Sequence, residues 1–169
     1  MARSASRIAA ISHQCKNHHL QPESENYYSE KLQMPVGDIV CENNPEVAEQ
    51  FLREMLHRVD GLLAVMITDR DGIPVVMSRT GKVPDVVSKQ NFLASVSLAI
   101  EQAGKLGCGK NRRIMCMFNS FQVVHFNKSP LMVSLVASAE ANTGLLLSLE
   151  SELNDFIEDL KAVIDIGNH

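Results

Sequence analysis

Three apolar segments lie close together in the second half of the sequence, and they constrain the fold more than any other feature. They cover residues 112–118, 122–127 and 131–137, and only three residues separate each segment from the next. Loops this short connect strands that are neighbours in a sheet and run in opposite directions. The sequence therefore predicts an antiparallel meander of three strands.

A hairpin is expected earlier in the chain. Residues 62–68 form a continuous apolar run, which is typical of a strand buried on both faces. Residues 69–72 then read Asp-Arg-Asp-Gly, a turn sequence whose glycine tolerates a positive φ. Residues 73–77 form the returning strand, and Pro74 predicts that this strand lies at an edge of the sheet.

Three amphipathic helices complete the predicted fold. The first starts at Asn44 and Pro45, because asparagine caps a helix and proline fits the first helical position. The second covers residues 85–106, and the third begins near Asn142 and Thr143. The apolar stripe of the second helix comprises Phe92, Val96, Ala99, Ile100, Ala103 and Leu106, and that of the third comprises Leu145, Leu149, Leu153, Phe156, Ile157, Leu160 and Ile164. The order α-β-β-α-β-β-β-α predicts an α+β fold, an α/β sandwich in which helices flank a five-stranded antiparallel sheet.

We expect residues 1–43 to be a disordered N-terminal extension and residues 44–169 to be one folded domain. The extension mixes polar residues without a sustained apolar period. Its basic, serine-containing start also overlaps in composition with a mitochondrial transit peptide, and an upstream extension of the reading frame is a third interpretation. These alternatives remain open. No metal is expected there, because no second cluster with zinc-site spacing accompanies His13, Cys15, His18 and His19.

Composition and motif spacing argue against a nucleic-acid-binding protein and against an enzyme. The net charge is −4 at pH 7, whereas nucleic-acid binding needs a positive excess. Residues 104–111 approach the phosphate-binding pattern but follow a helix and carry Asn111 where a hydroxyl residue is required. No side chains form a catalytic group, and no cofactor is expected. The cysteines lack disulfide or metal spacing, which indicates a cytosolic protein, and no apolar run is long enough to span a membrane.

Charge is unevenly distributed along the domain. Residues 105–128 contain five basic residues and no acidic residue, whereas residues 143–169 contain six acidic residues and one lysine. Two solvated faces are the simpler interpretation. The alternative is that a basic and an acidic surface steer different partners, since complementary fields raise encounter rates.

Several short segments between residues 46 and 166 occur in a specific order and spacing. They are Asp69-Arg70-Asp71-Gly72-Ile73-Pro74-Val75, Lys105-Leu106-Gly107, Gln122-Val123-Val124, Phe126-Asn127 and Ala141-Asn142-Thr143-Gly144-Leu145. Together with the order of elements, they resemble the roadblock (dynein light-chain-like) family and, within it, the MEK-binding partner subunits of the Ragulator scaffold. Residues 1–43 have no counterpart in this resemblance.

The resemblance implies a non-catalytic scaffold or adaptor. Such subunits pair with a sister roadblock-fold subunit as a heterodimer, join other Ragulator subunits and scaffold the MEK and ERK kinases. They also help to recruit Rag GTPases for activation of the mTOR complex. The implied location is the cytosolic face of late endosomes and lysosomes, where a separate lipid-anchored partner provides the contact with the membrane.

The resemblance places the pairing surface on the second helix and the third strand, here residues 85–106 and 112–118. The sequence supports this surface in part, because an edge strand is a template for pairing and methionines adapt to a partner. Leu98 also lies off the apolar stripe of its helix, among small and polar residues. The expected partner interface comprises Asn91, Ala94, Ser95, Leu98, Gln102, Arg112, Arg113, Met115 and Met117.

Two other functions of the same fold remain as alternatives. One is a dynein-associated roadblock light chain. The other is a regulator of small GTPases, which would need an arginine that reaches a bound nucleotide. Arg112 and Arg113 form the one adjacent arginine pair, and their position in a strand makes them weak candidates for that role.

Overall fold

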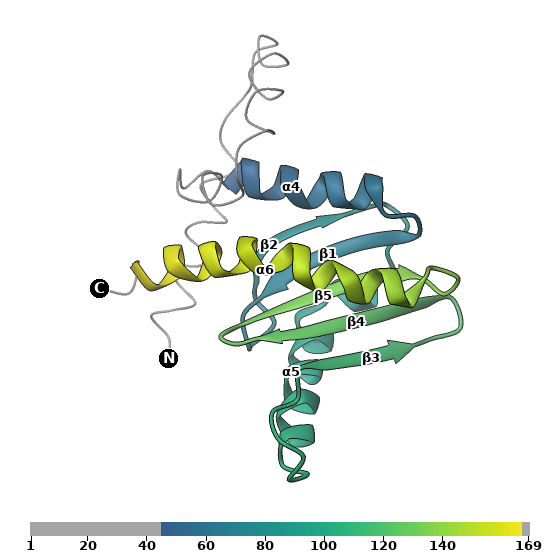
Figure 1. The fold of residues 1–169 in the computed structure, drawn as a ribbon. Helices are drawn as coiled ribbons and strands as arrows, with labels where there is room; N and C mark the ends of the chain where they lie inside the picture. Colours follow the sequence, from purple (N-terminus) through teal and green to yellow (C-terminus); the bar gives the residue numbers. More distant parts are fainter. Residues whose placement is uncertain (1–44, 167–169) are drawn as a thin grey trace.

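The computed structural model describes residues 45–166, which form a five-stranded antiparallel sheet with helices on both faces (Figure 1). The strand order is β2-β1-β5-β4-β3, so β2 and β3 are the two edges. The predicted fold class and order of elements are confirmed, whereas residues 1–43 lie outside the described residues. The elements are α4 (Pro45–Arg58), β1 (Leu62–Thr68), β2 (Pro74–Arg79), the 3-10 helix η1 (Asp85–Ser88), α5 (Gln90–Gly104), β3 (Arg113–Met117), β4 (Phe121–Lys128), β5 (Leu131–Ser138) and α6 (Thr143–Ile166).

The sheet separates two cores of different size. Helices α4 and α6 cover one face, and the larger core lies between them and the sheet. Helix α5 and η1 cover part of the opposite face, where the buried clusters are smaller. Strands β1 and β5 lie in the middle of the sheet and are buried almost throughout, as the continuous apolar run at 62–68 predicted.

The two predicted hairpin regions are confirmed, with strand ends that differ slightly from the expectation. The meander of β3, β4 and β5 has a connection of three residues, 118–120, and one of two residues, Ser129 and Pro130. In the first hairpin, the carboxylate of Asp69 accepts hydrogen bonds from the backbone N–H groups of Asp71 and Ile73, at 2.9 and 2.8 Å. Gly72 has a φ of +77°, and a Cβ added to it would lie 2.8 Å from the carbonyl oxygen of Gln90. Both the turn and its approach to α5 therefore require glycine.

The prediction of one continuous helix over residues 85–106 is wrong. The chain forms η1, becomes extended at Lys89 (φ −77°, ψ 137°), and then starts α5. The valine pair that precedes Ser88 is a poor helix former, which accounts for the short first turn. Helix α5 buries Leu93, Val96 and Ile100, while Leu106 lies beyond its end with 75% of its surface exposed.

Helix α6 starts where the sequence predicted, but one residue of its apolar stripe differs. The side-chain oxygen of Asn142 accepts a hydrogen bond from the N–H of Leu145 at 3.1 Å, which is N-cap geometry. Leu146 is fully buried, three residues before the buried Leu149, whereas Leu145 is 45% exposed. None of the described helices is both long and apolar enough to span a membrane.

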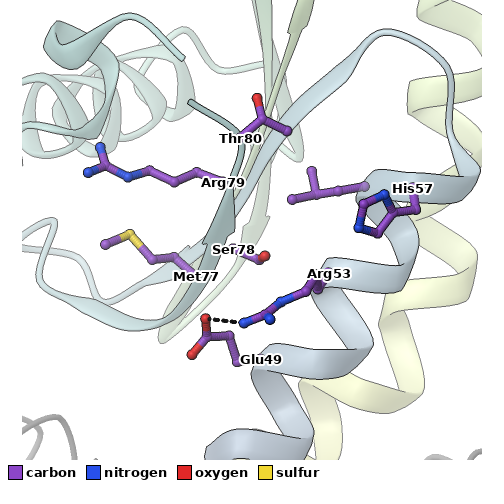
Figure 2. A pocket seen from close by; sticks show the side chains of 8 residues that line it. Glu49, Arg53, His57, Met77, Ser78, Arg79 and Thr80 are labelled. Atoms are coloured by element: carbon purple, nitrogen blue, oxygen red, sulfur yellow. Dashed lines mark hydrogen bonds and ion pairs between the residues drawn. The ribbon is translucent and has the colours of Figure 1, made fainter. Parts of the chain in front are cut away.

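The edge strand β2 lies beside α4, and the two run along each other (Figure 2). Side chains from the outer side of α4 and residues at the end of β2 surround an open hollow of about 420 Å³. At the opposite edge, Met115 and Met117 of β3 are largely exposed.

Candidate interaction surface

The outer edge of β3 presents a row of backbone groups that have no partner within the described chain. Hydrogen bonds at both ends fix the alternation of the β3–β4 ladder: Asn127 N–H donates to the carbonyl of Arg112 at 2.8 Å, and Phe118 N–H donates to that of Phe121 at 2.9 Å. In an antiparallel pair, every second residue bonds to the neighbouring strand and the residues between them point their backbone groups away. The outward residues are Arg113, Met115 and Met117.

A mostly apolar surface lies along this edge on the α6 side. The sheet register places Met115 opposite Val124, a residue of the core under α6, so Met115 and Met117 point to that face. Their exposed fractions are 52% and 70%. We call this surface the methionine flank, and it comprises Met115, Met117 and Leu145.

Sequence reasoning missed one member of the methionine flank, Leu145, and one exposed aromatic residue on the opposite face, Phe118. Phe118 is 43% exposed and stacks, with ring centroids 4.6 Å apart, on Phe121, which packs against the core on the α5 side. Leu145 follows Thr143, whose hydroxyl donates to the side chain of Gln122, the residue opposite Met117. The predicted apolar stripe places Leu145 in the core. The spacing of Leu146, Leu149 and Leu153 is the sequence signal for a stripe rotated by one residue, which leaves Leu145 exposed.

On the other face, α5 carries the second group of predicted interface residues. Ile114 of β3 packs against Val96 and Ile100 of α5, so this helix supports the edge strand from below. Leu98 points away from that contact and is 56% exposed. We call the outward row of this helix the α5 stripe, and it comprises Asn91, Ala94, Ser95, Leu98 and Gln102.

The predicted interface residues thus fall into two groups on opposite faces of the sheet. The α5 stripe lies on one side of the β3 edge, and the methionine flank lies on the other. Arg112 lies just before β3 and is exposed. The outward backbone groups of β3 lie between the two groups, so a chain that paired with β3 would reach both of them.

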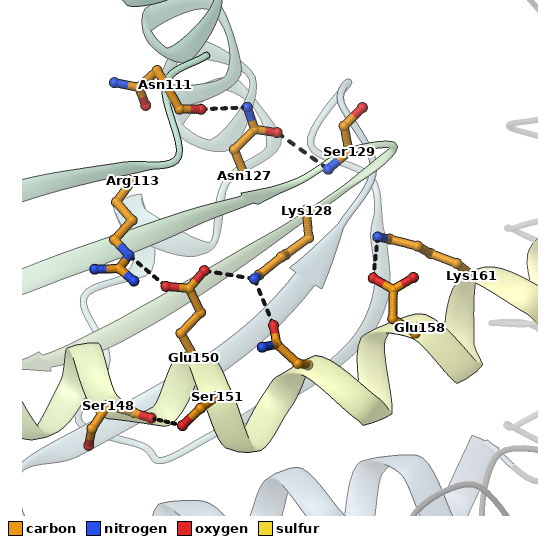
Figure 3. A network of polar contacts seen from close by, with 11 residues as sticks. Asn111, Arg113, Asn127, Lys128, Ser129, Ser148, Glu150, Ser151, Glu158 and Lys161 are labelled. Carbon is orange, nitrogen blue, oxygen red and sulfur yellow. Dashed lines mark hydrogen bonds and ion pairs between the residues drawn. The ribbon is translucent and has the colours of Figure 1, made fainter. Parts of the chain in front are cut away.

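Arg113 is held by α6 (Figure 3). Its Nε lies 2.5 Å from a carboxylate oxygen of Glu150, whose other oxygen lies 2.7 Å from the Nζ of Lys128. Burial favours the neutral form of Glu150, but the hydrogen bonds and charges of Lys128 and Arg113 outweigh it and hold its pKa below the usual value. The basic stretch and the acidic helix therefore partly neutralise each other, and the interpretation as two separate solvated faces is wrong for these residues.

His125 supports the same edge from within. It is fully buried opposite Ile114, with Nδ1 2.8 Å from the hydroxyl of Ser134 and its ring 6.2 Å from that of Phe92. Burial lowers the pKa of His125 to about 4. A neutral histidine in this position packs the sheet and offers no exposed nitrogen to a ligand.

Sequence comparison finds relatives over the same residues that form the fold. A family described as "Mitogen-activated protein kinase kinase 1 interacting" matches residues 46–164. The Ragulator complex protein LAMTOR3 of Homo sapiens is 43% identical over 119 residues, which are 70% of this chain and 96% of that protein. The protein of the same name from Taeniopygia guttata has the same identity and coverage.

Solved structures share the fold at much lower sequence identity. A Roadblock/LC7 domain from Streptomyces avermitilis superposes with a TM-score of 0.52 at 16% identity, covering 65% of this chain and 97% of that domain. A structure described as MglB with tetrameric arrangement gives 0.57 at 17% identity, covering 70% and 91%. The fold is therefore of the roadblock type, and the chain belongs to the mitogen-activated protein kinase kinase 1 interacting family.

Proposed function

We propose that this protein is an adaptor subunit of a Ragulator-like complex, without catalytic activity of its own, and that it pairs with a sister roadblock-fold subunit. The observation that carries the assignment to such a complex is the similarity to proteins named Ragulator complex protein LAMTOR3, which extends over 96% of their length. We therefore propose that this chain assembles into a complex of the same kind.

The β3 edge is the proposed pairing surface. A strand of the partner would bond to the outward backbone groups of Arg113, Met115 and Met117 and extend the sheet across two chains. Its side chains would cover the methionine flank, where flexible thioethers can adapt to an irregular surface. On the opposite face, Ala94 and Ser95 are small enough to let a partner helix approach Leu98.

Three finer parts of the function follow from the same proposal. The description of the family supports MEK as a kinase partner. ERK and Rag GTPases are proposed as further partners of the assembled complex. We also propose that the complex works on the cytosolic face of late endosomes and lysosomes, held there by a lipid-anchored subunit.

The position of Arg113 favours an adaptor over a GTPase regulator. A catalytic arginine must reach the nucleotide of its partner. The guanidinium of Arg113 is bonded to Glu150 instead, and the side chain would have to leave a carboxylate that is only 14% exposed. The adaptor proposal needs no such rearrangement.

Native affinity purification of the full chain, followed by mass spectrometry of the intact complex, tests the proposal. We expect stoichiometric recovery of a sister roadblock subunit together with other Ragulator subunits. Recovery of dynein intermediate chain in their place would support the light-chain alternative. Stimulation of GTP hydrolysis by the isolated protein would contradict a purely adaptor role.

A further inference from the structure

The second edge of the sheet has the same backbone pattern as the first. Thr80 N–H donates to the carbonyl of Leu63 at 2.8 Å, which fixes the alternation of the β1–β2 ladder. The residues that alternate with Thr80 and Ser78 therefore direct their backbone groups away from β1. These are Met77 and Arg79, and no described residue forms a backbone hydrogen bond with them from outside the sheet.

The side chains around this edge differ from those around β3. Figure 2 shows Glu49, Arg53 and His57 on α4 at one side of β2, with Met77 and Arg79 directed to the other side. Six of the eight residues that line the hollow have charged or polar side chains, and the hollow is open along the edge strand. The arrangement is a trough beside an edge strand and suits an extended chain better than a compact ligand.

The trough has more positive than negative side chains. Its one carboxylate, on Glu49, already lies 3.0 Å from a guanidinium nitrogen of Arg53. Arg79 is exposed and has no ion-pair partner among residues 45–166. Carboxylates of a bound chain would therefore meet uncompensated positive charge at Arg79 and a second basic residue, His57, on the opposite wall.

We propose that the β2 edge binds an extended acidic segment of a partner protein, which adds a sixth strand to the sheet. The segment would bond to the outward N–H and carbonyl groups of Met77 and Arg79. Its side chains would point alternately toward the α4 wall and toward the Arg79 side, so acidic residues on either face would find a basic partner. This inference does not rest on pairing at β3, because the two edges lie at opposite ends of the sheet.

A peptide library displayed on phage, selected against the full chain, tests the proposal. The probes are random peptides of about ten residues. We expect the selected peptides to carry Glu or Asp at alternating positions, and Arg79→Glu to weaken their binding by about tenfold or more. Replacing the facing Glu of the peptide with Lys should then restore binding to the Arg79→Glu variant.

Backbone pairing is tested separately with N-methylated versions of a selected peptide. Methylation of the residues whose N–H groups face β2 should abolish binding, and methylation of the alternate residues should have little effect. Lys110→Glu, a charge reversal at an exposed residue of the loop before β3, is the matched control and should leave binding unchanged.

The proposal is overturned if the full chain selects no peptide, if selected peptides lack acidic residues, or if both methylation patterns act equally. A photoreactive residue at position 77 then identifies the alternative occupant. A cross-link within the chain to residues 1–44 would assign the edge to the protein itself. A cross-link between two copies would assign it to self-association, and each of these results excludes a partner segment.

Discussion

The two edges of the sheet have the same backbone chemistry but different surroundings. At β3, the outward residues Arg113, Met115 and Met117 lie between an apolar flank and the exposed Leu98. At β2, the outward residues Met77 and Arg79 lie beside a trough lined by charged side chains. Unpaired N–H and carbonyl groups can form hydrogen bonds with any extended strand, so the flanking side chains determine which strand binds. The β3 edge suits a folded, apolar partner, and the β2 edge suits an extended, acidic one.

The edges also differ in what holds them in place. Strand β3 is tied to α6 through Glu150 and rests on Val96, Ile100 and the buried His125. Strand β2 packs against α4 and begins with Pro74, which lacks the N–H that another strand would need. Changes in pH and single substitutions should therefore affect the two edges differently.

The largest expected effect comes from a proline at the pairing edge. Met115→Pro removes an outward donor and places a ring in the path of a partner strand, while the bonds from β3 to β4 remain. We expect affinity for the sister subunit to fall by about 3 kcal/mol, or roughly 150-fold, by isothermal titration calorimetry, because a carbonyl of the partner is left buried without its donor. Met77→Pro at the other edge is the control and should leave this affinity unchanged; equal losses would remove the distinction between the edges.

Acid should destabilise the β3 side through His125. Its pKa is about 4 in the fold and about 6.5 when unfolded, so between these values the unfolded chain binds the extra proton. Stability should therefore fall as the pH drops below about 6.5, with a total loss of about 3 kcal/mol complete below about 4. Urea unfolding across this range should show the loss in the native protein and a flatter profile in His125→Gln. Parallel profiles would contradict the account.

Loss of the carboxylate of Glu150 should have a smaller effect. Glu150→Gln leaves Arg113 and Lys128 without their shared anion, and we expect it to cost about 1–2 kcal/mol of unfolding free energy at pH 7. Because the pKa of Glu150 is lowered in the fold, its contribution is present at neutral pH and lost as the pH falls through that pKa.

Thermal unfolding of Glu150→Gln at pH 7 and pH 3 measures this dependence. The deficit of the variant should shrink at the lower pH. Glu158→Gln, which breaks the exposed pair with Lys161, is the control and should cost less than about 0.5 kcal/mol. A similar cost for both variants would show that Glu150 does not anchor the edge.

The smallest predicted effect concerns the α5 stripe. Leu98→Glu places a charge where the partner helix should pack, and we expect about a tenfold loss of affinity for the sister subunit with an unchanged melting temperature. Light scattering of the mixed subunits measures the pairing. An unchanged heterodimer would remove α5 from the interface while leaving the β3 edge in place.

Much of the fold was predictable because its signals are local. The short connections of the meander, the turn at Gly72 and the cap at Asn142 each depend on residues that are close in sequence. The break at Lys89 was missed because the apolar spacing of 85–106 is continuous across it. The valine pair before Ser88 disfavours a longer helix, and Val87 and Leu93 pack into one cluster under the sheet on either side of the extended Lys89.

The edge strand and the α5 side of the candidate surface were predictable, whereas Leu145 and the bond from the edge to α6 were not. Methionines in a terminal strand of a meander predict an exposed interaction surface, and Met115 and Met117 are exposed. The ion pair between Arg113 and Glu150 joins residues that are far apart in sequence, so no local sequence pattern predicts it. The trough beside β2 was missed for the same reason, because it forms only where α4 and β2 meet.

The central claim is that the sister subunit pairs with β3. Hydrogen–deuterium exchange at single amides, compared between the isolated chain and the heterodimer, tests it most directly. The N–H groups of Arg113, Met115 and Met117 should exchange quickly in the isolated chain and become protected when the sister subunit is added. Those of Met77 and Arg79 should stay unprotected in the same sample. Protection at Met77 and Arg79 with none at β3 would contradict the assignment of the pairing edge.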